Sequence, residues 1–340
     1  MKNKKWISLA AAVIFAVTAL PATVFAAKNG ESKEELTKVT LNEVAHSIFY
    51  APQYVAIEEG YFAEKGLDLT LVTGFGADKT MTAVISGEAD IGFMGAEASV
   101  YAYQEGATDP VVNFAQLTQR AGNFLVAREE MPDFKWEDLE GEKVLGGRKG
   151  GMPEMVFEYI LKKNGIDPQK DLTIDQSVDF GSTAAAFTSD DSAAYTVEFE
   201  PSATILEKEG AGYVVASLGE ASGYVPYTSY STKASYMKEN PEIIQKFTDA
   251  LQKGMDYVQN HTPEEIAEVI APQFKETDLE TITAIVKRYY DQDTWKENLI
   301  FEKDSFELLQ DILEDAGELT DRTAYENLVQ TEYAQKACKN

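Results

Sequence analysis

The stretch SIFYAPQYVAIEEGYFAEKGLDL, residues 47–69, contains the pattern that decides the fold. Phe49, Tyr50 and a proline precede an apolar helix, and two glycines then lead into a strand-like run. A helix that passes directly into a strand in this way is typical of the βα units that build parallel sheets. The pattern predicts that the first half of the stretch lines a ligand cleft and that the second half forms the wall behind it.

Strand-like and helix-like runs keep alternating on both sides of this stretch. Strands are expected at 38–45, 67–73, 89–94 and 111–117, and helices at 52–59, 79–86 and 97–105. This order predicts an α/β fold with parallel sheet built from βα units. In such sheets a ligand lies at the carboxyl ends of the strands, in the loops that follow them.

A second alternating series follows, and the end of the chain is helical. Strands are expected at 124–127, 143–145, 172–176, 194–199 and 213–217, with a helix at 153–164 and another that opens at Pro201. From Pro241 onward the pattern is helical, with four successive helical runs. Two of these runs have a capping pair at their predicted start, formed by Thr262 with Glu265 and by Asp304 with Glu307.

The simplest architecture is therefore two α/β lobes with a helical tail. Residues 38–120 and 226–335 are expected to form one lobe, and residues 121–225 the other. Hinges are expected at 117–124 and 222–231, where glycines and a proline interrupt the pattern.

Composition excludes several classes of function. The 340 residues include 57 acidic and 30 basic side chains, so the net charge is −27 and nucleic acid is not an expected partner. The only cysteine is Cys338, which excludes an intrachain disulfide and a cysteine metal cluster. His46 and His261 are the only histidines and offer little for a catalytic triad or a histidine metal site, so neither catalytic residues nor a metal are expected.

The N-terminus resembles an export signal. Three lysines precede an apolar stretch from Trp6 to Leu20, and small residues follow at the spacing used for cleavage after Ala26. This pattern predicts a cleaved signal peptide at residues 1–26, the alternative being a transmembrane anchor. No cysteine lies near the cleavage site to carry a lipid, so an exported protein, periplasmic or otherwise extracytoplasmic, is expected.

Four segments carry a resemblance to a known family. They are YAPQYVAIEEGYFAEKGLDL (50–69), SGEADIGFMG (86–95), EFEPSATILEKEG (198–210) and VPYTSYSTKASYMKENPEIIQKF (225–247). Together they resemble the ABC-transporter solute-binding proteins of the sulfonate, nitrate, taurine and thiamine-pyrimidine-precursor class. The resemblance implies a two-lobed type II periplasmic-binding-protein fold with mixed sheets, helices on their faces and a helical C-terminal tail. It also implies a monomer without a cofactor, which closes on a small-molecule ligand and delivers it to a membrane permease.

The first lobe offers ligand-binding candidates in three loops that follow strands. Phe49 and Tyr50 present flat surfaces for a planar ligand, the alternative being that both pack in the core. Phe75 and Asp78 belong to the glycine-containing loop GFGAD, which is equally consistent with an ordinary tight turn. Glu97, at a helix start, is either a hydrogen-bond acceptor for an amine or a carboxylate placed to favour the helix dipole.

The second lobe offers a glycine cluster and an acidic strand end. Arg148, Lys149, Gly150 and Gly151 precede a helix and predict an anion-binding loop, the alternative being a flexible turn. The resemblance places Glu200 at the cleft, although it also fits a helix cap. The remaining candidates are Tyr195, Glu198 and, at the crossing back to the first lobe, Tyr227.

The balance of these groups favours a planar, amine-bearing heterocycle such as a thiamine pyrimidine precursor. Several carboxylates and aromatic rings suit such a ligand, whereas a sulfonate or nitrate ion would depend on Arg148 and Lys149. A pyrimidine-synthesising enzyme branch of the same family carries an active-site histidine where this chain has Tyr50, and a cysteine-rich motif that is absent here. The sequence therefore predicts a binding protein and not an enzyme.

Overall fold

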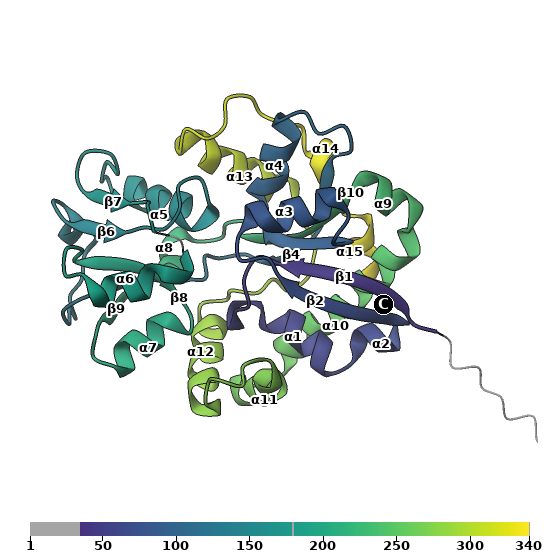
Figure 1. Ribbon diagram of the computed structural model, residues 1–340, viewed down its shortest axis with the longest axis horizontal. Helices are drawn as coiled ribbons and strands as arrows, with labels where there is room; N and C mark the ends of the chain where they lie inside the picture. The colour runs from purple at the N-terminus through teal and green to yellow at the C-terminus, as the bar shows by residue number, and fades with distance from the viewer. Residues whose placement is uncertain (1–34, 179, 340) are drawn as a thin grey trace, which may run out of the picture. The chain divides into compact units, whose positions relative to one another are not determined.

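The computed structural model describes residues 35–178 and 180–339, and residues from Glu35 to the C-terminus form one compact unit. The predicted signal peptide, residues 1–26, lies outside the described residues. Two five-stranded sheets organise this unit, and Figure 1 shows them side by side. We call each sheet, with the helices that pack on it, a lobe.

The first sheet has the strand order β2-β1-β3-β10-β4. Its strands are β1 (Thr37–Glu43), β2 (Leu67–Thr73), β3 (Ile91–Gly95), β4 (Val111–Thr118) and β10 (Thr228–Lys233). β1 runs parallel to β2 and β3, but β10 is inserted antiparallel between β3 and β4. The βα units predicted from the alternating pattern form the parallel part of this sheet, and β10 is antiparallel because it returns from the second lobe and enters the sheet from the opposite end.

The second sheet has the strand order β7-β6-β8-β5-β9. Its strands are β5 (Asn123–Ala127), β6 (Lys143–Leu145), β7 (Thr173–Asp175), β8 (Tyr195–Phe199) and β9 (Tyr213–Ser217). β6 is parallel to β7 and β8, whereas β5 is antiparallel to β8 and β9. Both sheets are therefore mixed, and the α/β, two-lobed fold expected from the family resemblance is confirmed. The lobe boundaries given above stay a prediction.

Helices follow most strands in both lobes. In the first part of the chain these are α1 (Ala51–Glu58), α2 (Tyr61–Glu64), α3 (Ala77–Ser86) and α4 (Glu97–Gln104), with a single 3-10 turn η1 (Ile48–Tyr50) before α1. In the second lobe they are η2 (Trp136–Leu139), α5 (Met152–Lys163), η3 (Phe180–Ser182), α6 (Thr183–Ser189), α7 (Ser202–Lys208) and α8 (Leu218–Ser222). α6 ends at Ser189, just before the polar residues that lead into β8.

The C-terminal part of the chain is helical, as expected. It contains α9 (Ala234–Glu239), α10 (Pro241–Asn260), α11 (Pro263–Ile270), η4 (Ala271–Gln273), α12 (Leu279–Asp291), α13 (Lys303–Asp315), α14 (Tyr325–Leu328) and α15 (Glu332–Ala337). The capping box of Thr262 and Glu265 is confirmed at the start of α11. The Asp304 cap was wrong, because α13 begins one residue earlier and Asp304 lies in its first turn.

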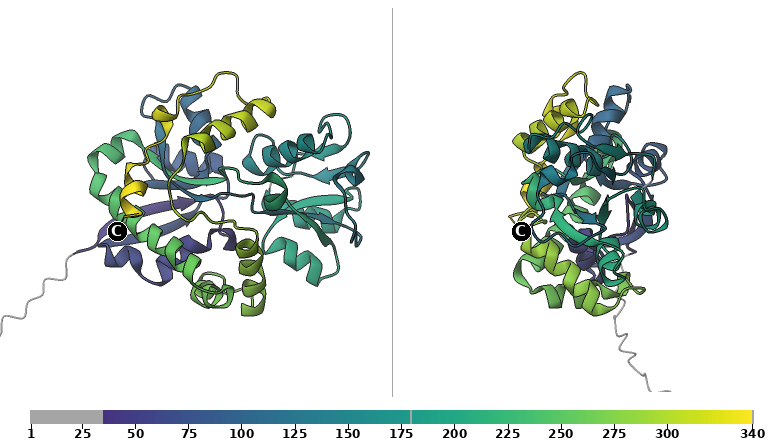
Figure 2. Two further views of the ribbon diagram at one scale, coloured as in Figure 1. Left: turned by 180° about the vertical axis from the view of Figure 1, so that it is seen from behind. Right: turned by 90° about the vertical axis from the view of Figure 1, so that its left-hand side faces the viewer.

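The C-terminal helices also cover the exposed edge of the first sheet. All eight residues of β4 are buried although this strand is the last of the sheet. Val329 and Trp295 form isolated bridges to β4, and Figure 2 shows the yellow end of the chain lying against this sheet. An edge strand that is covered in this way cannot pair with another chain.

Two short segments cross between the lobes, residues 119–122 and 223–227, and α12 braces the first of them. The Tyr289 hydroxyl donates to the Gly122 carbonyl at 2.8 Å, and the Gln292 amide donates to the Ala121 carbonyl at 3.2 Å. Within the described residues, no helix has the length and apolar character required to cross a bilayer.

Candidate functional site

Aromatic rings from both lobes meet next to the crossing segments. Phe49 is buried on η1, where the Ser47 hydroxyl accepts a hydrogen bond from the Phe49 amide and so fixes the start of the turn. Its ring centroid lies between 5.1 and 5.7 Å from those of Tyr50, Tyr289, Tyr227 and Phe199. Because Phe199 ends β8 in the second sheet, this cluster joins the two lobes.

Gly122 allows the closest approach between the crossing segment and this cluster. A Cβ atom at position 122 would lie 2.5 Å from the Phe49 ring. Any side chain there would displace the ring, so the glycine allows the first crossing segment to pass directly over it.

Glu97 lies at the interface of the lobes, and only one of its two carboxylate oxygens accepts a hydrogen bond within the described residues. It is the first residue of α4 and is only 3% exposed. Its carboxylate accepts a hydrogen bond from the backbone N–H of Met152, which opens α5 in the second lobe. Its Oε2 atom has no hydrogen-bond partner among the described residues. Burial raises the pKa of Glu97 to about 7, although its own backbone N–H, the Met152 N–H and the Arg148 charge oppose this shift.

The rings of Tyr50 and Tyr227 both lie near the Phe49 ring, at centroid distances of 5.1 and 5.6 Å. Tyr227 is 2% exposed, and its hydroxyl also lacks a partner in the described part of the chain. Burial, followed by the charges of nearby groups that include Glu97, raises the pKa of both tyrosines well above the usual value. We group Glu97, Tyr50 and Tyr227 together because both rings lie near Phe49 and the Glu97 charge contributes to the raised pKa of each hydroxyl.

The glycine-rich loop 146–151 pairs its cations with acids that lie outside the second sheet. Arg148 lies 3.9 Å from Asp78 at the start of α3, and Lys149 lies 3.2 Å from Glu318. Gly150 accepts a hydrogen bond from the Tyr101 hydroxyl at 3.0 Å, and its own N–H donates to Glu154 at 3.1 Å. The predicted anion-binding groups of this loop are thus already engaged, and the loop fastens the two lobes together.

Four predicted site residues lie outside the group formed by Glu97, Tyr50 and Tyr227. Phe75 has a positive φ of 56° and is 76% exposed. Tyr195 directs its hydroxyl to Met131 and to the Asp138 carbonyl, each at 3.4 Å. Glu198 accepts from the Thr196 hydroxyl at 2.7 Å, and burial raises its pKa to about 7.

The fourth, Glu200, has both carboxylate oxygens engaged. Thr204 donates to them through its N–H and its hydroxyl at 3.0 Å each, and Arg288 donates to Oε1 at 2.7 Å. These are the contacts expected of a carboxylate at the start of α7, combined with an ion pair to α12. The Ser47 hydroxyl donates to the Glu200 carbonyl at 3.2 Å, so the residue joins the lobes through its backbone.

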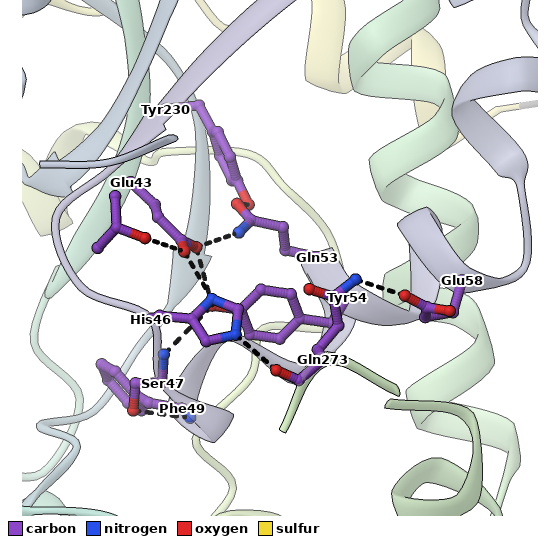
Figure 3. A network of polar contacts seen from close by, with 10 residues as sticks. Glu43, His46, Ser47, Phe49, Gln53, Tyr54, Glu58, Tyr230 and Gln273 are labelled. Atoms are coloured by element: carbon purple, nitrogen blue, oxygen red, sulfur yellow. Dashed lines mark hydrogen bonds and ion pairs between the residues drawn. The ribbon is translucent and has the colours of Figure 1, made fainter. Parts of the chain in front are cut away.

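Sequence reasoning missed a buried polar network around Glu43, at the end of β1. Figure 3 shows the His46 ring beside this carboxylate. Oε1 accepts from His46 Nδ1 at 2.8 Å and from the Thr73 hydroxyl at 3.1 Å. Oε2 accepts from Gln53 and Tyr54, each at 2.8 Å. The signal available in the sequence was an acid at a strand end followed three residues later by a histidine.

This network positions the turn that carries Phe49 and Tyr50. His46 Nε2 lies 2.9 Å from the Gln273 carbonyl, and the Tyr230 hydroxyl donates to Gln53 at 2.8 Å. The contacts thereby link β1, α1, β10 and η4, so the turn is anchored from four sides.

We expect His46 to stabilise the protein mainly at acidic pH. Both ring nitrogens face acceptors, and the hydrogen bond to Glu43, opposed by burial, raises the pKa of His46 above 6.5. A raised histidine pKa gives stability that is fully present below pH 6.5 and is lost as pH rises through the folded value. Urea unfolding of His46→Gln and wild type from pH 5.5 to 9 should differ by about 1–2 kcal/mol at the acidic end and by less at the alkaline end. A difference that does not change with pH would contradict this.

Two surface hollows of the structure lie away from the candidate site residues. Hollows of about 280 and 210 Å³ lie between α10 and α15 and on the outer part of the second lobe, and neither is lined by a predicted site residue. In the described part of the chain, no three His, Cys, Asp or Glu side chains lie close enough to hold a metal ion.

The chain is similar to known proteins in sequence and in fold. Residues 48–266 match the family model described as NMT1/THI5 like. The chain is 44% identical over 332 residues to the "Putative binding protein YtlA" of Bacillus subtilis, and the aligned residues make up 98% of each chain. It is 24% identical over 214 residues to the riboflavin-binding protein RibY of Chloroflexus aurantiacus, and the aligned residues make up 62% of this chain and 58% of the relative.

A solved structure shows the same fold. The alkanesulfonate-binding protein SsuA of Xanthomonas axonopodis pv. citri, bound to MOPS, superposes with a TM-score of 0.70 at 15% identity, covering 87% of this chain and 99% of that one. At 15% identity this likeness is one of fold, and the relative of 44% identity is described as a putative binding protein. The chain belongs to the NMT1/THI5-like family.

Proposed function

We propose that this protein captures a planar heterocycle bearing an amine or ring N–H between its lobes and delivers it to a membrane permease. Thiamine pyrimidine precursors are the ligand class that we favour. The observation that carries the proposal is that neither the buried Oε2 atom of Glu97 nor the buried hydroxyl of Tyr227 has a hydrogen-bond partner among the described residues. Buried polar atoms in native proteins are normally paired, so two such atoms at one interface indicate that a ligand supplies the partners.

The charge of these groups favours a hydrogen-bond donor over an anion. An ionised carboxylate has acceptors only, and it therefore selects a ligand N–H or an ammonium group. Phe49 and Tyr50 supply apolar surfaces for a flat ring at the same place. A sulfonate would bring negative charge beside Glu97, where burial already disfavours the ionised form.

Sulfonate or nitrate binding is the second candidate. Arg148 and Lys149 lie on a loop in which Gly147 and Gly150 adopt positive φ values of 80° and 74°. An anion that displaced Asp78 from Arg148 would gain this cation, but the 3.9 Å pair between these residues already uses it.

Ligand binding would close the lobes about the two crossing segments. The contacts that opening breaks include Arg148 with Asp78, Lys149 with Glu318, and the Tyr101 hydroxyl with the Gly150 carbonyl. A ligand that bridges the lobes shifts the open and closed populations by its differential affinity for the closed form. Closed protein would then dock on the permease as a monomer.

The site of action would be outside the cytoplasm. The residue pattern at 1–26 supports export and removal of a signal peptide. The acidic composition is compatible with a freely diffusing protein that meets its permease at the membrane surface.

A thermal-shift screen tests the proposed ligand class. Residues 27–340, which contain the whole compact unit from Glu35, are heated with 4-amino-5-hydroxymethyl-2-methylpyrimidine, thiamine, riboflavin, taurine, methanesulfonate, nitrate or bicarbonate. A ligand present at 100 times its Kd stabilises the folded state by about 2.7 kcal/mol and raises the melting temperature. We expect a shift with the aminopyrimidine that is lost in Glu97→Ala. A shift with methanesulfonate or nitrate alone would move the site to Arg148 and Lys149 and overturn the proposal.

A further inference from the structure

Asn123 is a buried amide for which the fold supplies no side-chain partner. It is the first residue of β5 and is 0% exposed. Neither its Nδ2 donor nor its Oδ1 acceptor has a hydrogen-bond partner among the described residues. Leaving such groups unpaired costs about 1–3 kcal/mol each, so an amide with both atoms unpaired requires an explanation.

The strand register places Asn123 beside the aromatic cluster. Asn123 pairs with Phe199 across the β5–β8 ladder, and residues directly opposite each other in a ladder share one face of the sheet. The Phe199 ring lies 5.7 Å from the Phe49 ring and 6.4 Å from the Tyr227 ring. The preceding residue, Gly122, is in contact with the Phe49 ring. The unpaired amide therefore lies next to the aromatic cluster that includes Tyr227.

The chemistry of this amide restricts the ligand further. An asparagine side chain offers a donor next to an acceptor and pairs with an edge that carries an acceptor next to a donor. Asparagine recognises the amine and neighbouring ring nitrogen of adenine in this way. An aminopyrimidine carries the same pair of groups. An oxyanion carries acceptors only, and it would leave both Asn123 Oδ1 and Glu97 Oε2 without partners.

We propose that Asn123 binds the ligand edge formed by an exocyclic amine and the adjacent ring nitrogen, from the side of the second lobe. This inference rests on the proposed function, since it assigns a residue and an atom pattern to the same ligand. Glu97 and Tyr227 bind from the first lobe and the returning crossing segment. A ligand held by Asn123 and Glu97 together bridges the lobes, so recognition of this edge and closure occur in one step.

The test compares two ligands that differ in one donor. The probes are 4-amino-5-hydroxymethyl-2-methylpyrimidine and 5-hydroxymethyl-2,4-dimethylpyrimidine, in which a methyl group replaces the amine. Wild type should bind the amine about 10–100-fold more tightly by titration calorimetry, the discrimination expected of a paired amide edge. Asn123→Leu should bind the two probes with nearly equal affinity. Asn164→Leu, which removes an exposed amide elsewhere in the second lobe, is the matched control and should keep the wild-type preference.

A second readout separates loss of recognition from loss of folding. Because the ligand-free amide is unpaired, Asn123→Leu should melt at or above the wild-type temperature without ligand. If this variant does not fold, Asn123→Ala, which removes both the donor and the acceptor with a smaller side chain, should also lose the preference. An unchanged preference for the amine in either variant overturns the assignment of Asn123 but leaves the ligand class intact. Failure of wild type to bind either probe overturns both proposals together.

Discussion

Replacing Glu43 with leucine is expected to lower the free energy of unfolding by about 3–5 kcal/mol, the range found when one partner of a buried charged pair is removed. The carboxylate is fully buried and accepts four hydrogen bonds, from His46, Thr73, Gln53 and Tyr54. Leucine fills a similar volume but leaves these donors facing an apolar group. Their lost hydrogen bonds make this the largest effect that we expect from a single substitution.

Urea denaturation at neutral pH measures this effect. Glu43→Gln keeps one acceptor oxygen and should cost less than the leucine variant. Glu88→Gln, which alters an exposed carboxylate on the same lobe, should change stability by less than 0.5 kcal/mol, a typical limit for surface substitutions. A leucine variant as stable as wild type would show that the network contributes little. Reduced ligand binding in Glu43→Gln would show in addition that the network positions Phe49 and Tyr50.

Replacing Glu97 with glutamine is expected to stabilise the ligand-free protein by about 3 kcal/mol at pH 8. Burial raises the pKa of this carboxyl from 4.5 to about 7. Between these values the unfolded chain releases its proton while the folded protein keeps it, so wild-type stability falls by about 1.4 kcal/mol per pH unit. Glutamine has no such charge to bury, and its side-chain oxygen still accepts from the Met152 N–H. Its advantage should therefore be absent near pH 4.5, grow up to pH 7 and remain constant above it.

Denaturant unfolding of both proteins from pH 5 to 9 checks this prediction, because other titrating groups cancel in the difference. Glu88→Gln serves again as the exposed control and should show no such pH dependence. If the two curves stay parallel across the range, Glu97 is not a buried carboxyl with a raised pKa. We also expect the stabilised variant to bind the aminopyrimidine more weakly, since a site that binds a ligand commonly carries a cost in stability.

Local sequence patterns predicted most of the secondary structure. Residues 67–73, 143–145 and 213–217 form strands with the expected bounds, because apolar, β-branched runs bounded by glycine and polar residues have few alternatives. The capping box at Thr262 depends only on residues three apart, and it too formed as expected. β10 was missed because its run of small hydroxyl residues gives a weak strand signal, and only its neighbours β3 and β4 fix its conformation.

The candidate site divides in the same way. Phe49, Tyr50 and Glu97 were identified because each follows a strand of a βα unit, and this position depends on local order. Asn123 was not identified, because a single asparagine at a strand start carries no signal of its own. Its importance arises from the pairing with Phe199 and from the absence of a partner among the described residues.

The sequence by itself determined the fold class of this protein, a two-lobed α/β chain that resembles a solute-binding family and is strongly acidic with a single cysteine. Periodicity, composition and short motifs carry that information, because they depend on neighbouring residues. Only the tertiary structure decided which side chains meet. In it Glu200 contacts Thr204 and Arg288, and Arg148 pairs with Asp78. Glu97, Tyr227 and Asn123 each have a buried polar atom without a hydrogen-bond partner among the described residues. Such contacts join residues from distant parts of the chain, and burial and hydrogen-bond competition in the folded protein determine which of them form.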